Sequence, residues 1–308
     1  MEQHTSIGTG NRMAGVAPHP LGERVLGWLL YSSVFISCCA FSLTVETYLL
    51  AGVPVSLPMA GFAFLATLFI YNLSSVQSML RHPRQTRYKQ SDDWGQKNKR
   101  LLAALGIVSI GAAAVVYIQF GLRINGWVMA HLALISIGYT VPIMFKARKV
   151  RPLRSVPLLK VFLIAYVWAA VTALFPLMQA GMQVWEPTAL WFFLRRFLFI
   201  LALALLFDIR DYTYDRTTNT LTFPGWVGVR NTKLLSLGLL AIYTMLLVSS
   251  EQGAVLWALV SSAAAAAVVV SLSSENKPRI YYALLADGAM LLHAGLVYLA
   301  MAQVAANT

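Results

Sequence analysis

The chain has 308 residues, of which 58% are hydrophobic and only 12% charged, and its mean hydropathy is +0.65. This balance excludes an ordinary soluble globular protein and predicts an all-α polytopic membrane protein. The net charge of +12 does not indicate nucleic acid binding, because the basic residues are confined to particular loops, as membrane topology requires. The two cysteines are adjacent within an apolar segment, so they indicate neither a disulfide framework nor a metal site.

Nine apolar segments follow a polar amino-terminal stretch. We expect residues 1–24 to be disordered and cytoplasmic, without a cleavable signal peptide. Because a helix needs about 20 mostly apolar residues to cross the hydrocarbon core, residues 25–305 are predicted to form one bundle of nine transmembrane helices. The predicted spans are 25–44, 57–77, 101–121, 126–146, 157–176, 188–208, 232–250, 253–272 and 279–303.

The distribution of Lys and Arg predicts the orientation of the bundle. With the amino terminus inside, all but three of the 24 basic residues fall on the inner side, the exceptions being Arg123, Arg195 and Arg196. We therefore expect an integral membrane protein with its amino terminus in the cytoplasm and its carboxyl terminus outside. Polar chemistry is expected at the cytoplasmic mouth, where the predicted inside loops are 78–100, 147–156 and 209–231.

Three of the twelve acidic residues follow the sixth predicted span, at Asp208, Asp211 and Asp215. On a helix they lie within about 60° of one another. Three carboxylates on one stripe at a membrane surface repel each other unless a cation lies among them. Mg²⁺ prefers such oxygen ligands and completes its shell with waters and substrate phosphates. The stripe therefore predicts a Mg²⁺-diphosphate site; the alternative is a solvated helix end with Arg210 and Arg216 as ordinary partners.

Polar residues at the ends of other spans are candidates for contact with the same substrate. Asn72 and Ser75 share a helix face at the end of the second span and carry oxygens that accept hydrogen bonds or coordinate weakly, although they can also simply cap the span. Lys146 ends the fourth span and Lys160 begins the fifth, and cations there would stabilise charge on a diphosphate leaving group. Topology alone explains basic residues in this loop, but not Lys160 at the start of an apolar run.

Further ionisable residues lie inside the spans. Arg195 and Arg196 precede Asp208 by about 18–20 Å along a helix, so they cannot reach the stripe. One is expected to extend to the outer interface and the other to pair with Asp287, the only carboxylate well within a predicted span. That pair is either a structural salt bridge or part of a functional site. His293 is expected to be a hydrogen-bonded interior histidine.

The sequence from Phe207-Asp208-Ile209-Arg210-Asp211 to Asp215-Arg216 resembles the second aspartate-rich motif of the UbiA-type intramembrane prenyltransferases. Nine predicted helices, polar motifs after the second and sixth spans, and a Tyr-Thr-x-Pro-x-x-x-Lys pattern from Tyr139 to Lys146 are similar to that superfamily. Its first motif reads Asn-Asp-x-x-Asp, whereas here Asn72 is followed by Leu73 and Val76 at the aspartate positions. A degraded first motif and the pair Asp287-Gly288 resemble a divergent bacterial subgroup.

The resemblance implies transfer of an isoprenyl group from an isoprenyl diphosphate to an aromatic or other lipophilic acceptor, with Mg²⁺ assisting ionisation. It implies that the three aspartates hold Mg²⁺ and that the substrate contacts Asn72, Ser75, Tyr139, Lys146, Lys160 and Arg216. Loss of two aspartates favours an alternative, a catalytically degenerate membrane protein that binds an isoprenoid or diphosphate lipid. A small-solute transporter is disfavoured, because no paired broken helices are indicated.

Overall fold

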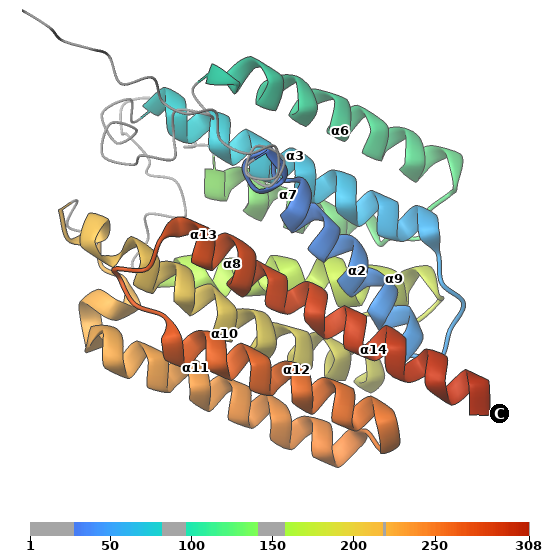
Figure 1. Ribbon diagram of the computed structural model, residues 1–308. Coiled ribbons are helices and arrows are strands. Elements are labelled where there is room, and N and C mark those ends of the chain that lie inside the picture. Colours follow the sequence, from blue (N-terminus) through green and yellow to red (C-terminus); the bar gives the residue numbers. More distant parts are fainter. Residues whose placement is uncertain (1–27, 82–96, 141–157, 218–219, 308) are drawn as a thin grey trace, which may run out of the picture.

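The computed structural model describes residues 28–81, 97–140, 158–217 and 220–307, and its regular elements in these ranges are all helices (Figure 1). The predicted amino-terminal segment 1–24 and Lys146 lie outside the described residues. The elements in chain order are α2 (Val34–Leu50), α3 (Leu57–Arg81), α6 (Lys99–Gln119), α7 (Gly126–Thr140), α8 (Leu159–Ala169), η2 (Ala170–Leu174), α9 (Phe175–Gln179), α10 (Pro187–Thr217), α11 (Phe223–Ser250), α12 (Gly253–Leu272), α13 (Arg279–Tyr281), η3 (Tyr282–Ala286) and α14 (Asp287–Asn307).

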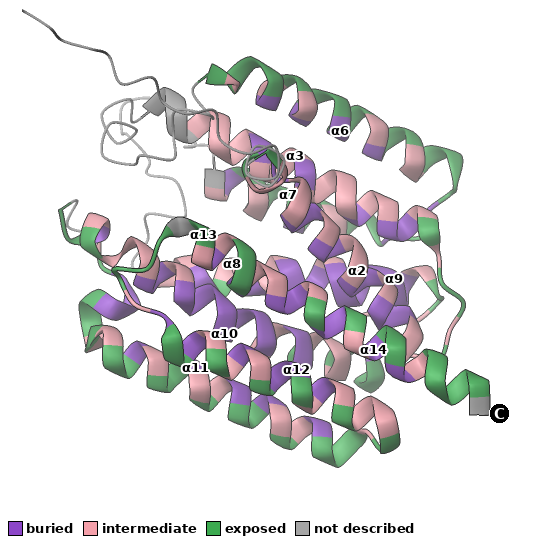
Figure 2. Ribbon diagram, in the orientation of Figure 1, coloured by how far each residue is buried: buried purple, intermediate pink, exposed green. Residues whose placement is uncertain are grey.

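The helices form one bundle around α10. Helix α10 packs against α8 on one side and α11 on another, and η2 and η3 also contact it. Every residue of α10 from Phe199 to Leu206 is buried, as Figure 2 shows by its colour. In contrast, α6 lies at one edge of the bundle against α3 and is exposed along most of its length. The apolar core is therefore built from the middle of α10 outward.

Apolar side chains also cover the outside of the bundle. Ile118 is 77% exposed, Met245 72% and Trp127 87%. In water such a surface would be unstable, whereas in a bilayer the lipid tails cover it. Within the described ranges, seven helices are long and apolar enough to cross a membrane, and α2 and α7 are shorter apolar helices. The protein is an integral membrane protein, and the predicted all-α class is confirmed.

Each predicted span overlaps a helix among the described residues, but the bounds of the first, sixth and seventh are wrong. The first span, predicted at 25–44, is α2, which begins at Val34 after the left-handed Ser33 (φ 65°) and continues to Leu50. Its second half contains Thr44, whose hydroxyl donates to the carbonyl of Ala40 in the same helix, so this polar residue is tolerated inside it.

The sixth span was predicted to end at Asp208, with a loop from 209 to 231. Instead α10 continues for two more turns to Thr217, and α11 begins at Phe223. The three aspartates therefore all lie on one continuous helix, which the assumed helical spacing of the stripe requires.

The fifth span contains a π-helical turn, η2, followed by Pro176 in α9. Proline has no backbone N–H, so Pro176 cannot donate to the carbonyl of Thr172, four residues earlier. That carbonyl instead accepts a hydrogen bond from the hydroxyl of Thr47 in α2 at 2.7 Å. The interruption of the fifth span thus permits a hydrogen bond between it and α2, which we call the joint between Thr47 and Thr172.

Candidate active site

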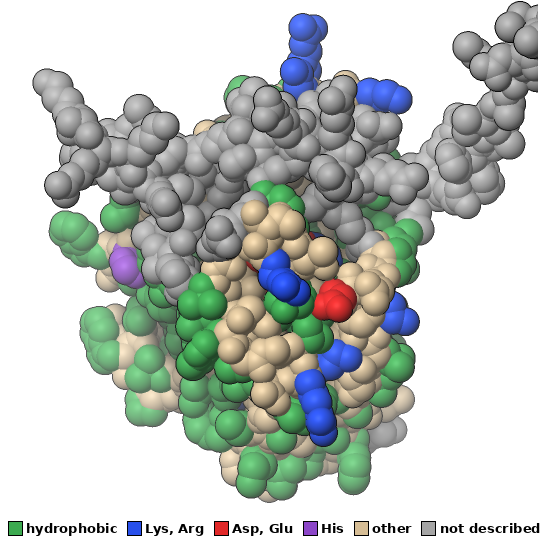
Figure 3. Space-filling view, turned by 90° about the vertical axis from the view of Figure 1, so that its left-hand side faces the viewer, with side chains coloured by type: hydrophobic (Ala, Val, Ile, Leu, Met, Phe, Trp, Pro, Cys, Tyr) green, Lys and Arg blue, Asp and Glu red, His purple; other side chains and the backbone are tan. Residues whose placement is uncertain are grey.

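The three aspartates occupy the last turns of α10, at the end of the bundle seen in Figure 3, where basic side chains and an acidic side chain reach the surface among polar residues. They do not project into bulk water. Asp208 is 1% exposed and Asp215 8% exposed, and Asp211 is half-buried. A carboxylate shielded in this way needs a cation or hydrogen-bond donors close by.

Lys160 supplies that cation for Asp208. Its Nζ lies 2.9 Å from Oδ1 of Asp208, and the Asp208 side chain is only 2% exposed. Leu158, two residues before Lys160, has a left-handed backbone (φ 61°). This conformation costs a residue other than glycine about 1–2 kcal/mol. This turn starts α8 directly beside α10, so that Lys160 in the first turn of α8 reaches the carboxylate.

Asp211 is held by its own neighbour in sequence. Arg210 donates from Nε and Nη2 to the two carboxylate oxygens of Asp211, at 2.9 and 2.8 Å. The guanidinium also lies over the ring of Phe207, 5.0 Å from its centroid. This planar two-point contact fixes the position of Arg210 at the rim of the bundle. The site thus alternates acidic and basic groups.

The remaining predicted contact residues are spread around this centre. Tyr139 lies in the last turn of α7, which packs against α8, the helix that carries Lys160. Arg216 is exposed, with its guanidinium 5.9 Å from the ring centroid of Tyr212. Ser75 is half-buried in α3. The roles predicted for these residues remain predictions, as does that of Lys146.

Asn72 is completely buried in α3. Its amide nitrogen donates to the carbonyl of Leu68 at 3.0 Å, while its Oδ1 has no hydrogen-bond partner within the part of the chain that the structure describes. A buried acceptor without a donor costs about 1–3 kcal/mol, so this oxygen is suited to a ligand that brings a donor or a cation.

The residue before it, Tyr71, belongs to the same region although the sequence pattern did not indicate it. Trp168 in α8 donates from its indole N–H to the Tyr71 hydroxyl at 3.2 Å, and the two rings meet edge to face. Tyr71 also interacts electrostatically with Tyr139 and with Asp287. Its position next to Asn72 was the available signal.

The donor set is suited to Mg²⁺ that arrives with a diphosphate, and not to an ion held by the protein alone. Within the described ranges, no three His, Cys, Asp or Glu side chains are grouped closely enough to hold a metal ion. Asp208 and Asp211 are instead neutralised by Lys160 and Arg210. Mg²⁺ commonly uses only one or two carboxylates and takes its other ligands from water and substrate phosphates.

Comparison with known proteins gives the fold. No family model matches the sequence, and no curated protein matches it either. Among solved structures, the apo structure of a UbiA homologue from Aeropyrum pernix K1 matches with a TM-score of 0.56 and 16% identity, covering 88% of this chain and 98% of that chain. A structure of digeranylgeranylglyceryl phosphate synthase matches with a TM-score of 0.51 and 13% identity, covering 91% of this chain and 97% of that one.

The fold is UbiA-type. This confirms, at the level of the fold, the resemblance that the motif after the sixth span indicates. Both similar structures are covered almost completely, so the UbiA-type bundle accounts for nearly the whole described chain rather than for one part of it.

A second buried cluster of charges lies elsewhere in the UbiA-type bundle, toward the opposite end of α10. Arg196 donates to both carboxylate oxygens of Glu46 in α2, each at 3.1 Å, and His293 Nε2 lies 3.1 Å from the same carboxylate. The prediction that one of the two arginines pairs with Asp287 is wrong, because α2 extends farther than predicted and brings Glu46 into the interior beside Arg196. Arg195 pairs with Glu251 rather than reaching the interface alone.

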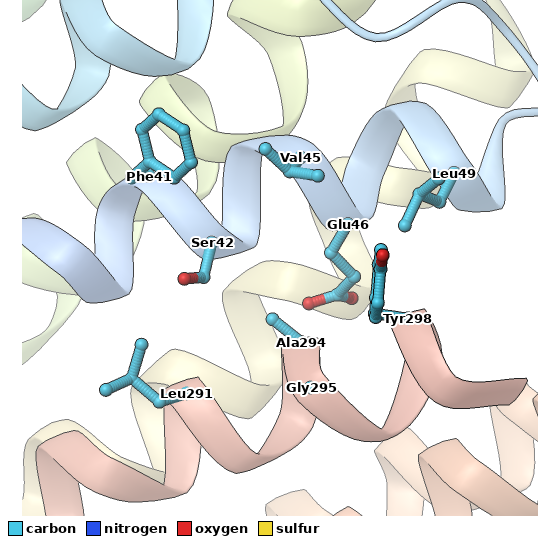
Figure 4. A pocket seen from close by; sticks show the side chains of 9 residues that line it. All are labelled: Phe41, Ser42, Val45, Glu46, Leu49, Leu291, Ala294, Gly295 and Tyr298. Carbon is cyan, nitrogen blue, oxygen red and sulfur yellow. The ribbon is translucent and has the colours of Figure 1, made fainter. Parts of the chain in front are cut away.

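The histidine of this cluster behaves as expected. Its Nδ1 lies 2.6 Å from the Ser262 hydroxyl, its ring stacks on Phe199, and it is 3% exposed. A cavity of about 220 Å³ between α2 and α14 has Glu46 in its lining (Figure 4). Because the cluster lies about 18 Å along α10 from Asp208, it is separate from the candidate active site, and its ion pairs join α2, α10 and α14.

Proposed function

We propose that the protein is an intramembrane prenyltransferase, which transfers an isoprenyl group from an isoprenyl diphosphate to an aromatic or other lipophilic acceptor. One observation carries the proposal: the ion pair between Lys160 and the buried Asp208 lies beside the Arg210–Asp211 pair at the rim of a UbiA-type bundle. Opposite charges held in a partly desolvated site bind a polyanion through the cations and a metal ion through the carboxylates.

The side chains divide into two roles. Lys160 would bind the diphosphate and hold its charge as the bond to the isoprenyl carbon breaks, together with Asn72, Ser75, Tyr139, Lys146 and Arg216. Asp208, Asp211 and Asp215 are the candidate carboxylates for Mg²⁺ that arrives with the substrate, one or two of them at a time. The ion would neutralise part of the charge on the departing diphosphate. Because Lys160 and Arg210 occupy two of these carboxylates in the free protein, the diphosphate must draw the cations away from them.

The aromatic pair Tyr71 and Trp168 supports the same chemistry. Tyr71 of α3 and Trp168 of α8 meet edge to face between these two helices. A positively charged allylic carbon is stabilised by aromatic faces. Rings at this place would protect such a carbon from water until the acceptor reacts with it.

The decisive test uses the purified protein in lipid nanodiscs with radiolabelled isoprenyl diphosphates of several lengths. We expect Mg²⁺-dependent release of diphosphate, lowered about 100-fold or more in Asp211→Asn, because charge stabilisation of the leaving group is worth about 3–4 kcal/mol. The matched control is Glu275→Gln, an exposed carboxylate, which should keep the parent rate. Tight binding without turnover, unchanged by a chelator, would instead establish the degenerate lipid-binding protein.

We also propose that the amino terminus is cytoplasmic and the carboxyl terminus lies outside in a bacterial inner membrane. In a background without Cys38 and Cys39, a cysteine at Ala306 should react with a membrane-impermeant maleimide in intact cells. A cysteine at Glu275 should react only after lysis. Both positions are exposed, so access differs only by the side of the membrane. The reverse labelling pattern would contradict the orientation.

A further inference from the structure

The cavity between α2 and α14 has the lining of a binding site for a small amphiphile. Its volume is about 220 Å³, and a protein cavity of about 150 Å³ already holds one benzene ring. Most of its lining is apolar and comes from both helices, namely Phe41, Val45, Leu49, Leu291 and Ala294 (Figure 4). An apolar hollow with a few polar groups in its lining is the usual form of a small-molecule site.

The hollow exists because α14 presents small residues to α2. A Cβ added at Gly295 would meet no other atom within 4 Å, so open space lies over this position. One turn farther along α14, Tyr298 also lines the cavity and is 60% exposed. The cavity therefore opens to the outside of the bundle, which lipid tails cover, and molecules dissolved in the bilayer have access to it.

Glu46 is the ionisable residue in this lining. It is 1% exposed, and Figure 4 shows its carboxylate directed from α2 toward α14. An ionised carboxylate accepts about four hydrogen bonds. Oε1 lies 3.1 Å from both Arg196 Nη2 and His293 Nε2, whereas Oε2 accepts only from Arg196 Nη1, also at 3.1 Å. Within the described residues, one acceptor position on Oε2 is therefore left for a ligand.

The charges around Glu46 determine what kind of ligand fits. Arg196 neutralises Glu46, and Arg195 is paired with Glu251. A further ion would be costly in the membrane interior. A neutral O–H group would instead donate to the remaining position on Oε2, and the apolar part of the same molecule would cover the rest of the lining.

We propose that this cavity binds a neutral lipophile with a hydroxyl group, an alcohol or a phenol dissolved in the bilayer, whose O–H donates to Glu46. The proposal is independent of the proposed function, because the Glu46 cluster lies about 18 Å along α10 from Asp208. It gives the buried Glu46–Arg196 pair a role beyond joining helices. Arg196 keeps the carboxylate ionised, and so a strong acceptor, at a depth where the ligand resides.

Photolabelling of the full-length protein in nanodiscs tests the proposal with two probes. One is hexadecanol with a photoreactive diazirine in its chain, and the other is the methyl ether of the same molecule, which lacks the O–H donor. Labelled residues are identified by mass spectrometry. We expect the alcohol to label 41–49 and 291–298, and the ether to label them about 10-fold less, because a hydrogen bond to a charged acceptor is lost. This comparison uses the parent protein and needs no substitution.

A variant that fills the cavity provides a second, independent measurement. Gly295→Leu places a side chain in the open space and removes no polar group, so it should lower labelling by the alcohol about 10-fold. The matched control is Gly238→Leu on α11, another exposed helical glycine with nothing within 4 Å of an added Cβ. It lies outside the cavity lining and should be labelled like the parent.

The outcomes are distinct. Equal labelling of α2 and α14 by the alcohol and the ether would show a crevice that accepts any acyl chain, and would overturn the proposal. Unchanged labelling in Gly295→Leu would overturn it as well, because the label would then not report on the cavity. A preference for the alcohol that is lost in Gly295→Leu and kept in Gly238→Leu would establish the site, whether or not the protein releases diphosphate.

Discussion

Replacing Glu46 by alanine is expected to destabilise the folded bundle by about 3–5 kcal/mol, the usual cost of removing one partner from a buried ion pair. Arg196 is 5% exposed and donates two hydrogen bonds to this carboxylate, so its charge would be left uncompensated in the interior. The stability can be measured by denaturant unfolding in detergent micelles, with tryptophan fluorescence as the signal.

The matched control removes both charges. The double variant Glu46→Leu with Arg196→Met keeps most of the volume and leaves no unpaired ion, so it should regain much of the lost stability, because well-packed apolar groups often replace buried ion pairs without loss. Equal destabilisation by the single and double variants would contradict the assignment of the cost to the stranded arginine. The cost would then lie in the lost contacts of the Glu46 side chain itself, because Arg196 keeps its contacts with Leu43 and Thr47 in the single variant.

Replacing Lys160 by methionine is expected to lower turnover by about 100–1,000-fold, because the site loses a cation that stabilises the leaving diphosphate. The change also leaves Asp208, with a 2% exposed side chain, without its ion-pair partner. Turnover is measured as release of labelled diphosphate, and binding of inorganic diphosphate is measured separately, so that a loss of both can be distinguished from a loss of chemistry alone.

Two matched variants make this result specific. Lys160→Arg keeps the charge at the same position and should retain more activity than Lys160→Met. Lys233→Met removes a half-buried lysine of α11 that donates to the carbonyl of Ser271, and it should leave turnover unchanged. Full activity in Lys160→Met would exclude a role for this lysine in the reaction and leave only its pairing with Asp208.

The sequence was sufficient for those features that depend on local patterns. Apolar segment length located a helix at each predicted span, because the bilayer requires about 20 apolar residues for each crossing. Within the described residues, seven of these helices are long enough to cross. The spacing of the aspartates correctly assumed a helix, although the span was predicted to end at the first of them. Hydropathy ended it there because it scores each charge as exposed, whereas Lys160 and Arg210 neutralise two of these charges.

Contacts between distant segments could not be obtained in this way. Glu46 lies beyond the first predicted span, which ends at residue 44. Its burial depends on its pairing with Arg196, 150 positions away. The partner of an arginine within a span depends on which helices pack together, and a single sequence does not contain that information. For the same reason, Asp287 was assigned to Arg195 or Arg196, which pair with Glu251 and Glu46 instead.

The joint between Thr47 and Thr172 has a consequence for how this chain can change over time. The carbonyl of Thr172 is available to Thr47 because position 176 is a proline and cannot donate to it. Restoring a peptide N–H at position 176 would offer that oxygen a second donor within its own helix, and the Thr47 hydroxyl, which also accepts from Arg196, would then have to compete for it. The proline and the threonine are therefore coupled, and homologous sequences should tend to retain or lose them as a pair.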